Sequence, residues 1–572
     1  MLVFKANKGV NYMKKKNRLV FILACMLIIS FLLSSCGNNN KAADTKSNAD
    51  TKKEDQASEP KKDSNASSEG KVLKIGTPYT IDTFNPYLTT SDGDRYVIAN
   101  IYETLISSDG GKLYPCLAES WEIADDNITY TLKIRDNAYW QTGNELFGDE
   151  KIKLTAQSIA DAFNFVMDEN NKSYHYADAV KYFKSFEATD DTTLIVTSNF
   201  PSALILKELS DVLIFPVEAM EKGYDLAKFP VGSGPYKFVE YRTDDKVILE
   251  KNTDYYISPG LDKVEFQIIP DKAVAAISLQ NNEIDIVPQL LNTDLEAVAS
   301  RDDLMLVPNS VGWYRYIGIN CSKPMFQDIK VRQAISLAID FEGIVSSIFD
   351  NDFGAMLAVN SYGGAVPLEF EGSNVEEWKK HYEYNPEKAA ALLEEAGWKK
   401  GSDSIFEKDG QKLKFAIKTP TSDQNRMKMG DMAATFLKTI GIDAASQPTE
   451  WATMLEDIKS GNTELFIMGG GSTVGGLNML FHSVLSSTGS HNVFYNDPEL
   501  DKMLDDAYSN VDTDERIKQL EEAALRALEN RVHAGGYFEY VQIGMNKKVK
   551  DFDKAPTLWY GLAGPTRNVT VE

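Results

Sequence analysis

Cysteine and histidine are scarce in this chain, which has only four cysteines and five histidines in 572 residues. Cys25 and Cys36 belong to the amino-terminal segment, so Cys116 and Cys321 alone remain in the body. A dense disulfide framework is therefore excluded, and the sequence leaves open whether these two thiols pair or stay reduced. The histidines lack metal-ligand spacing, and neither a His-Glu-x-x-His motif nor a Gly-x-Ser-x-Gly motif occurs. We therefore expect no enzyme, no metal site and no cofactor.

Basic residues are fewer than acidic ones, with 60 Lys and Arg against 84 Asp and Glu, so the net charge is −24. A nucleic-acid partner needs clustered Lys and Arg to neutralise phosphates, so the charge argues against one. Beyond the amino-terminal segment, no run of 18 uninterrupted apolar residues occurs, and we expect no further membrane span.

The amino-terminal segment joins a basic cluster, Lys14–Arg18, to a short apolar run, Leu19–Leu33. The run is shorter than the ~20 residues that a spanning helix needs, and it predicts a signal peptide over residues 1–35. Leu33-Ser34-Ser35-Cys36 resembles a bacterial lipobox, which implies cleavage before Cys36 and lipid on that residue. A plain signal peptide with a chance cysteine is the alternative.

Residues 38–70 contain no Val, Ile, Leu, Met or aromatic residue. Such a segment cannot bury enough apolar surface to offset its chain entropy, so we expect residues 36–70 to be a lipidated cysteine with a disordered tether. A flexible chain of this length spans roughly 30 Å, which suits a protein held away from a membrane surface.

The body from residue 71 onward interleaves strand and helix signals. Val72–Gly76 and Ile128–Ile134 have strand patterns, and Thr155 can cap a helix with one apolar face. Two segments predict helix starts, Asn385-Pro386-Glu387 and Asn496-Asp497-Pro498. Each combines a capping residue with a proline or acid in the first turn, and a periodic segment follows. This alternation is typical of α/β architecture.

A series of short blocks stands in order along the body. They are Tyr102-Glu103-Thr104-Leu105, Leu117-Ala118-Glu119-Ser120-Trp121, Tyr130–Arg135, Val231-Gly232-Ser233-Gly234-Pro235-Tyr236, Asn282-Glu283-Ile284-Asp285, Val331-Arg332-Gln333-Ala334, Ala396-Gly397-Trp398 and Asp497-Pro498-Glu499-Leu500-Asp501. The ordered set resembles bacterial extracellular solute-binding protein family 5, which includes the oligopeptide-, dipeptide- and nickel-binding lipoproteins of ABC importers. Each block by itself has a structural interpretation, such as a tight turn at Gly232–Pro235.

The resemblance implies an α/β fold of the periplasmic-binding-protein type II class, a two-lobed clamp that closes about a hinge. Lobe I would comprise residues 71–102, 209–297 and 531–572. An extra subdomain, residues 103–208, would be inserted in it, and lobe II would comprise residues 298–530.

The resemblance also implies where ligand binds. In peptide-binding relatives, the strand-to-loop segment that matches Leu465–Asn478 carries an aspartate that pairs with the ligand's α-ammonium group. Here the matching positions are about Ser472 or Thr473, and no acidic residue occurs over residues 465–496. Glycines and hydroxyls there suit close backbone approach and neutral hydrogen bonds. The expected ligand-binding residues, each with a loop or core interpretation as the alternative, are Trp313, Tyr314, Trp451, Gly470, Gly471, Ser472, Thr473, Asn478 and Tyr537.

We therefore expect a lipid-anchored, monomeric substrate-binding component of an ABC importer, outside the cell membrane of a Gram-positive bacterium. It would capture oligopeptides and deliver them to permease subunits. An oligosaccharide ligand is the alternative that the missing aspartate favours, and nickel or haem carriage ranks third. A peptide or pheromone receptor without transport would use the same fold.

The lipobox generates a direct test. We expect Cys36→Ala to release the protein from membranes or to leave it unprocessed, because the thiol that accepts lipid is gone. Membrane fractionation and metabolic palmitate labelling measure this, with Cys25→Ala as the matched control. Unchanged labelling of the Cys36 variant would contradict lipidation at this residue.

Overall fold

The computed structural model describes residues 70–572 except 90, 110–111, 309–312, 350–357, 362–382, 472–475, 488–490, 540–541 and 553–560. The signal peptide, Cys36 and the tether lie outside the described residues. Within the described part, no helix is both long enough and apolar enough to cross a membrane.

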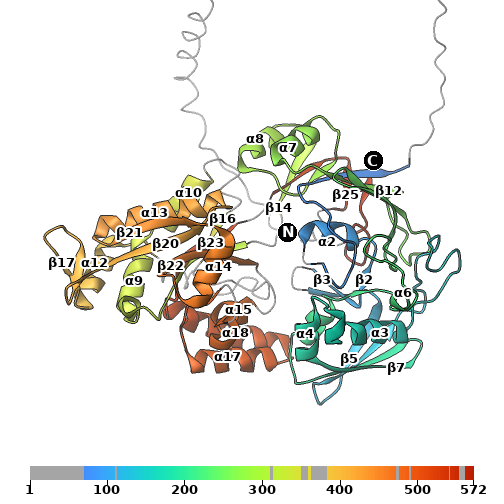
Figure 1. The fold of residues 1–572 in the computed structure, drawn as a ribbon, viewed down its shortest axis with the longest axis horizontal. Helices are drawn as coiled ribbons and strands as arrows, with labels where there is room; N and C mark the ends of the chain where they lie inside the picture. Colours follow the sequence, from blue (N-terminus) through green and yellow to red (C-terminus); the bar gives the residue numbers. More distant parts are fainter. Residues whose placement is uncertain are drawn as a thin grey trace, which may run out of the picture. The chain divides into compact units, whose positions relative to one another are not determined.

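The first sheet has seven strands in the order β10-β11-β12-β1-β13-β24-β14 (Figure 1). Its strands are β1 (Val72–Thr77), β10 (Tyr236–Arg242), β11 (Lys246–Lys251), β12 (Lys263–Ile268), β13 (Ile286–Val287), β14 (Leu304–Pro308) and β24 (Gln542–Asn546). The predicted first strand is thus confirmed as β1, whose Leu73 and Ile75 are buried. It pairs in parallel with β12. Helices α7 (Lys272–Gln280) and α8 (Leu295–Ala299) lie along the chain between these strands.

A smaller four-stranded sheet has the order β5-β6-β8-β7. Its strands are β5 (Ala118–Ile123), β6 (Thr129–Ile134), β7 (Phe183–Asp190) and β8 (Thr193–Ser198). Helix α3 (Ala156–Val166) buries Ile159, Phe163 and Val166 against it, and Thr155 caps that helix through a capping box with Ser158. The strand predicted around Tyr130 and the helix predicted after Thr155 are therefore both present.

Shorter elements surround these two sheets. They are α2 (Asp92–Ile98), β2 (Glu103–Thr104), β3 (Ile106–Asp109), β4 (Lys112–Pro115), α4 (Tyr176–Tyr182), α5 (Ile205–Leu209), β9 (Leu213–Ile214), α6 (Glu218–Glu221), β25 (Val549–Lys550) and β26 (Thr570–Val571). Strand β2 pairs with β9, so the four-stranded sheet arises from the chain between two paired strands.

The other large sheet has six strands in the order β16-β23-β15-β22-β20-β21. They are β15 (Trp313–Ile319), β16 (Ala358–Ser361), β20 (Lys414–Pro420), β21 (Asp443–Thr449), β22 (Leu465–Gly471) and β23 (His533–Glu539). Strands β21, β20 and β22 run parallel, and β15 runs antiparallel to both β22 and β23. A small three-stranded sheet contains β17 (Lys399–Lys400), β18 (Phe406–Lys408) and β19 (Gln411–Lys412).

Helices cover both faces of the six-stranded sheet, because alternate strand residues pack in different cores. Ile317 and Ile467 share a core with α9 (Ile329–Ala338) and α13 (Gln424–Ile440). Their neighbours Tyr316 and Phe466 share another core with the helices of the opposite face. The helices of this opposite face are α14 (Trp451–Ser460), α15 (Gly476–Phe481), α17 (Pro498–Ser509) and α18 (Thr513–Glu529). Helix α16 (Ser483–Ser487) follows α15 along the chain. Helices α10 (Phe341–Ile348) and α12 (Pro386–Glu395) lie on the same face as α9.

Both predicted helix starts are confirmed. Asn385 accepts a hydrogen bond from the Lys388 backbone N–H, and α12 begins at Pro386. The second cap is Asp497, which accepts from the Leu500 backbone N–H at the start of α17. Arg526 of α18 also donates to the Asp497 carboxylate at 2.8 and 2.9 Å, so this cap ties two helices together.

The chain passes from the seven-stranded to the six-stranded sheet between Pro308 and Trp313, and it returns between Glu539 and Gln542. Both passages come later along the chain than the lobe boundaries at residues 298 and 531, which stay predictions. Strand β14 pairs with β24 in the seven-stranded sheet, and β23 pairs with β15 in the six-stranded sheet. Strand pairing therefore assigns residues 304–308 to the first sheet and residues 533–539 to the second.

The turn at Gly232–Pro235 has the structural role that its sequence predicts. The Gly234 N–H donates to the Ile101 carbonyl at 2.8 Å, and Gln141 donates to the Gly234 carbonyl at 3.1 Å. Ser233 donates to the buried Glu103 carboxylate at 2.7 Å. Burial raises the pKa of Glu103, although hydrogen bonds from Ser233 and neighbouring tyrosines oppose this.

Three buried polar side chains have defined surroundings. Cys116 and Cys321 are both free and buried, so no disulfide joins them. Arg332 of α9 donates to the Phe326 carbonyl at 2.7 Å and the Asn530 carbonyl at 2.9 Å.

The close approach at Gly232 yields a stability prediction. A Cβ atom at this position would lie 2.1 Å from the Ile101 carbonyl oxygen, which is rigid backbone. We expect Gly232→Ala to lower the free energy of unfolding by about 2 kcal/mol or more. Urea denaturation measures this, with Gly564→Ala as control because a Cβ there meets nothing within 4 Å. Equal stability of the two variants would contradict the tight-turn interpretation.

Candidate functional site

The candidate site lies at the edge where the parallel strands of the six-stranded sheet end. Strands β20, β21 and β22 end at Pro420, Thr449 and Gly471. Helices α13 and α14 begin shortly afterwards, and ligands of α/β sheets bind outside such carboxyl ends. We call this the carboxyl edge.

Antiparallel pairing brings two further strand ends to the carboxyl edge. Trp313, the first residue of β15, pairs with Gly471 of β22 and with Glu539 of β23. Gly470, in turn, pairs with Tyr314. Four of the predicted ligand residues therefore have neighbouring or paired backbone positions. The side chain of Trp313 lies outside the described residues, as do Ser472 and Thr473.

Tyr314 belongs to a buried aromatic stack. Its side chain is fully buried, and its ring centroid lies 5.0 Å from that of Tyr316. The Tyr316 ring stacks in turn on His533 at 3.9 Å. Burial lowers the pKa of His533 well below the usual value of a histidine, so the stack is uncharged near neutral pH. Tyr314 therefore packs as a core residue, and its predicted ligand contact stays a prediction.

Trp451 differs from the buried Tyr314, because it is 37% exposed. It is the first residue of α14, directly after Glu450, which caps the helix through the Ala452 and Thr453 N–H groups. The Arg426 guanidinium lies 5.3 Å from the centre of the Trp451 ring. This distance suits a cation–π contact, which holds the indole at the edge.

Asn478 and Tyr537 each carry a polar atom without a hydrogen bond among the described residues. The Asn478 side-chain oxygen, on α15, is buried and unpaired. The Tyr537 hydroxyl is likewise unpaired on a fully buried side chain. Burial, with the nearby Glu539 carboxylate, raises the pKa of Tyr537 well above its usual value.

A cluster of charged side chains that the sequence did not predict accompanies these residues. Arg315 donates to Glu539 at 2.8 Å, and Asn425 donates to the other Glu539 oxygen at 2.8 Å. Arg426 donates from Nε to Asp423 at 2.7 Å. We call Arg315, Asp423, Asn425, Arg426 and Glu539 the edge cluster. The one sequence signal for this cluster is the spacing of Glu539, which follows the predicted ligand residue Tyr537 by two residues on β23 and so shares its face of the sheet.

Glycine makes room for the edge cluster. Gly469 pairs with Arg315 across β22 and β15, and a Cβ at Gly469 would lie 3.0 Å from Arg315 Cδ and closer still to its guanidinium. The arginine side chain therefore occupies the space that a side chain at residue 469 would fill. From there it reaches Glu539.

The carboxylates near the carboxyl edge already have partners. Burial raises the pKa of Asp423, but Arg426, a backbone N–H and Arg315 outweigh burial, so the pKa is lowered. Asp457 pairs with Lys418 on β20, and Glu450 caps α14. Glu539 accepts from Arg315 and Asn425. Within the described residues around this edge, each of these acids is engaged with protein donors.

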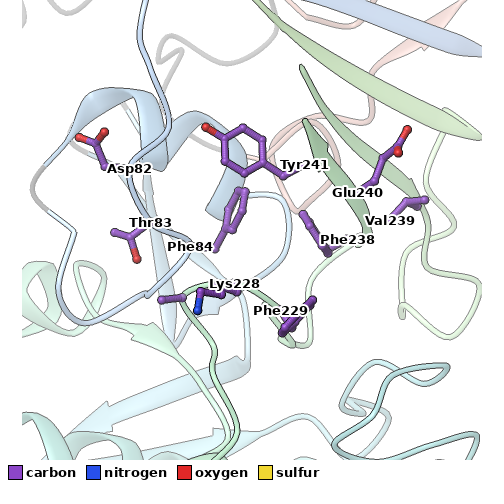
Figure 2. Close-up of a pocket in the computed structure, with 10 residues that line it drawn as sticks. Asp82, Thr83, Phe84, Lys228, Phe229, Phe238, Val239, Glu240 and Tyr241 are labelled. Carbon is purple, nitrogen blue, oxygen red and sulfur yellow. The ribbon is translucent and has the colours of Figure 1, made fainter. Parts of the chain in front are cut away.

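A separate pocket of about 430 Å³ lies beside the edge strand β10 (Figure 2). Phe84 lines it, and its ring centroid lies 5.1 Å from that of Phe238 and 5.4 Å from that of Tyr241. The Tyr241 hydroxyl donates to the Ile81 carbonyl at 2.9 Å. These contacts fasten the segment around Phe84 to β10, so we interpret the pocket as structural. No group of His, Cys, Asp and Glu among the described residues could hold a metal ion.

Comparison with known proteins identifies the family. Residues 112–492 match the family described as bacterial extracellular solute-binding proteins, family 5. The chain is 28% identical over 557 residues to oligopeptide-binding protein AppA of Bacillus subtilis, covering 95% of this chain and 97% of that protein.

Solved structures agree with this result. The structure of Bacillus subtilis AppA in complex with a nonapeptide matches with a TM-score of 0.68 and 26% identity, covering 88% of this chain and 99% of that one. The structure of HbpA2 from Haemophilus parasuis matches with a TM-score of 0.76, 23% identity, and coverage of 88% and 100%, which shows the fold alone. The predicted α/β fold with two lobes is therefore confirmed. The chain belongs to the bacterial extracellular solute-binding proteins of family 5.

Proposed function

We propose that this protein is the peptide-binding component of an ABC importer. It captures oligopeptides outside the membrane and passes them to permease subunits, without covalent chemistry. Its similarity to AppA along nearly the whole chain supports this function. Binding would act by stabilising the closed arrangement of the two lobes over the open one.

The observation that carries the proposal is the composition of the carboxyl edge. A partly exposed indole, Trp451, lies beside the edge cluster, whose side chains are only partly exposed. Strand β22 ends there in Gly469-Gly470-Gly471, with the Arg315 side chain over Gly469 and Met479 close to Gly470. An aromatic wall and fixed charges together fit a peptide, which has apolar side chains and charged ends.

The membrane attachment is part of the proposal. Cleavage before Cys36 and lipidation of its thiol would anchor the protein, and residues 37–70 would act as the tether. This arrangement fits a Gram-positive cell, where a binding protein without an outer membrane around it needs an anchor. We further propose that the protein works as a monomer.

The acidic side chains near the carboxyl edge are already bound to protein donors, and this determines how the amino end of a ligand can bind. Where peptide-binding relatives place an aspartate, this chain has no acid over residues 465–496. The nearby acids Asp423, Glu450, Asp457 and Glu539 all bind protein donors. Burying an unpaired ammonium group costs several kcal/mol. We therefore infer that the amino end of the ligand binds through neutral hydrogen bonds or remains in water.

Acetylation of a bound peptide tests this inference. The purified protein is exposed to a casein hydrolysate and an oligosaccharide mixture, and native mass spectrometry identifies what is retained. A retained peptide is then synthesised with free and N-acetylated amino ends and titrated calorimetrically. We expect acetylation to change its affinity by less than about tenfold, or 1.4 kcal/mol.

A larger loss on acetylation would contradict the neutral amino-end site and restore a conventional ammonium anchor. Retention of an oligosaccharide, with no peptide retained, would contradict the proposed peptide function and favour the sugar-binding alternative.

Removal of the exposed Trp451 indole tests whether peptides bind at the carboxyl edge. We expect Trp451→Ala to weaken peptide binding by about tenfold, because the ligand loses its aromatic wall. Calorimetric titration measures the affinity. Tyr384→Ala is the control, since Tyr384 is 42% exposed and lies at the start of α12, away from the carboxyl edge. Equal affinities of the two variants would place the site elsewhere.

A further inference from the structure

A turn and a helix end from distant parts of the chain meet at one hydrogen bond. The Ala203 backbone N–H donates to the Tyr508 carbonyl at 2.8 Å. Ala203 lies in the short connection between β8 of the four-stranded sheet and α5, whereas Tyr508 belongs to α17, which covers one face of the six-stranded sheet. In the clamp that the family resemblance implies, Ala203 belongs to lobe I and Tyr508 to lobe II. The bond would therefore connect the two lobes.

This bond completes the carboxyl end of α17. The last four carbonyl groups of a helix have no partner within the helix. At this end the Ala507 carbonyl accepts from the Asn510 N–H at 3.1 Å, and the Asn510 carbonyl accepts from Arg516 of α18 at 3.1 Å. The Tyr508 carbonyl accepts from Ala203 instead. Part of the cap of α17 thus comes from a segment beside the four-stranded sheet.

A tight turn holds Ala203 in place. The Ile205 N–H donates to the Ser202 carbonyl at 3.3 Å, which makes Ala203 the second residue of a four-residue turn. Leu204 has φ −82° and ψ −12°, close to the values of the third residue of a type I turn. The Ser202 carbonyl also accepts from the Tyr130 hydroxyl at 3.4 Å. The turn is therefore fastened to β6, and the N–H of its second residue is available to a partner outside it.

The surroundings of the bond are mostly excluded from water. Ser202, Leu204 and Tyr508 are all buried. Leu204 and Tyr508 belong to one hydrophobic cluster, which also contains Ile205 of α5 and Leu504 of α17. A buried N–H or carbonyl group that loses its partner costs free energy. Separation of the two lobes would break this bond and bring water to these side chains.

The contact is distinct from the chain passages and from the carboxyl edge. Strands β14, β15, β23 and β24 border the passages, and the ends of β20, β21 and β22 form the carboxyl edge. The turn before α5 and helix α17 are different elements. Both partners of the bond are backbone groups of the protein, so the bond forms in the same way whatever solute is bound.

We propose that the Ala203–Tyr508 bond and the packing around it form a latch, which stabilises the closed arrangement of the lobes independently of the solute. The latch would raise the fraction of molecules that are closed, and so would raise the affinity for every solute by the same factor. Selectivity would come from other residues, those that contact the solute. This inference rests on the two-lobed clamp and not on the proposed peptide ligand.

A proline at residue 203 tests the latch. Ala203→Pro removes the N–H donor, and the second position of a type I turn accepts proline. Two peptides of different sequence that the protein retains from casein hydrolysate are titrated calorimetrically. We expect Ala203→Pro to weaken both by the same factor of about five, because the closed state loses one hydrogen bond. Ala203→Ser keeps the N–H and should stay within about twofold of the unsubstituted protein.

A second proline separates the latch from a general effect of proline. Asp125→Pro substitutes the matching position of the exposed β5–β6 turn, in which the Asn127 N–H donates to the Ala124 carbonyl at 2.9 Å. This variant should keep both affinities within about twofold. A loss as large as that of Ala203→Pro would overturn the latch.

Hydrogen exchange of the unsubstituted protein is a test that needs no variant, and it decides the question if Ala203→Pro unfolds. The Phe84 N–H, which donates to the Ala227 carbonyl at 3.1 Å, serves as the reference because both residues belong to the expected lobe I. Without solute, the Ala203 amide should exchange at least about tenfold faster than the Phe84 amide, since lobe separation exposes only the former. A bound peptide should slow exchange of the Ala203 amide alone. Mass spectrometry with fragmentation to single amides measures both.

The outcomes separate the latch from the proposed function. Unchanged affinities of Ala203→Pro, or an Ala203 amide that exchanges as slowly as that of Phe84 without solute, would overturn the latch. Unequal losses for the two peptides would also overturn it, because the turn would then contact the solute. Failure of every hydrolysate peptide to bind would overturn the proposed peptide function instead, and exchange of the solute-free protein would still decide the latch.

Discussion

Strand pairing on each side of the two chain passages constrains the whole molecule. On one side Pro308 pairs with Gln542, and on the other side Trp313 pairs with Glu539. Each sheet therefore holds the two chain segments side by side where they enter or leave it. In the two-lobed clamp that the family resemblance implies, closure about a hinge would move these two strand pairs relative to each other.

The position of the site follows from this constraint. Trp313 and Glu539 are the last paired residues before the passages, and Glu539 holds Arg315 and Asn425 of the edge cluster. The edge cluster thus begins beside the strand pair that borders the passages between the two sheets. Under the proposed function, a ligand bound there would act next to the segments that join the two lobes, so coupling of binding to closure would need no long pathway.

Local signals in the sequence predict several elements of the structure correctly. The caps at Thr155 and Asn385 and the strand at Val72 depend on residues close together in the chain, and the structure has them. The family, and with it the two-lobed fold, came from an ordered set of blocks. The edge cluster could not be found in this way, because Arg315 and Glu539 are 224 residues apart and meet only through strand register. Tyr314 is fully buried in the structure, which the sequence did not indicate, and its predicted ligand contact stays a prediction.

Gly469 gives the ligand-side sheet an unusual surface. Since the Arg315 side chain lies over this glycine, the floor at that point is an arginine stem rather than a row of upright side chains. The two positions are therefore mutationally interdependent. A side chain at residue 469 would force the Arg315 side chain to shift, and a shorter residue at 315 would leave space over the glycine. Substitutions at the two positions would therefore affect each other, and with them the surface that the sheet presents at this edge.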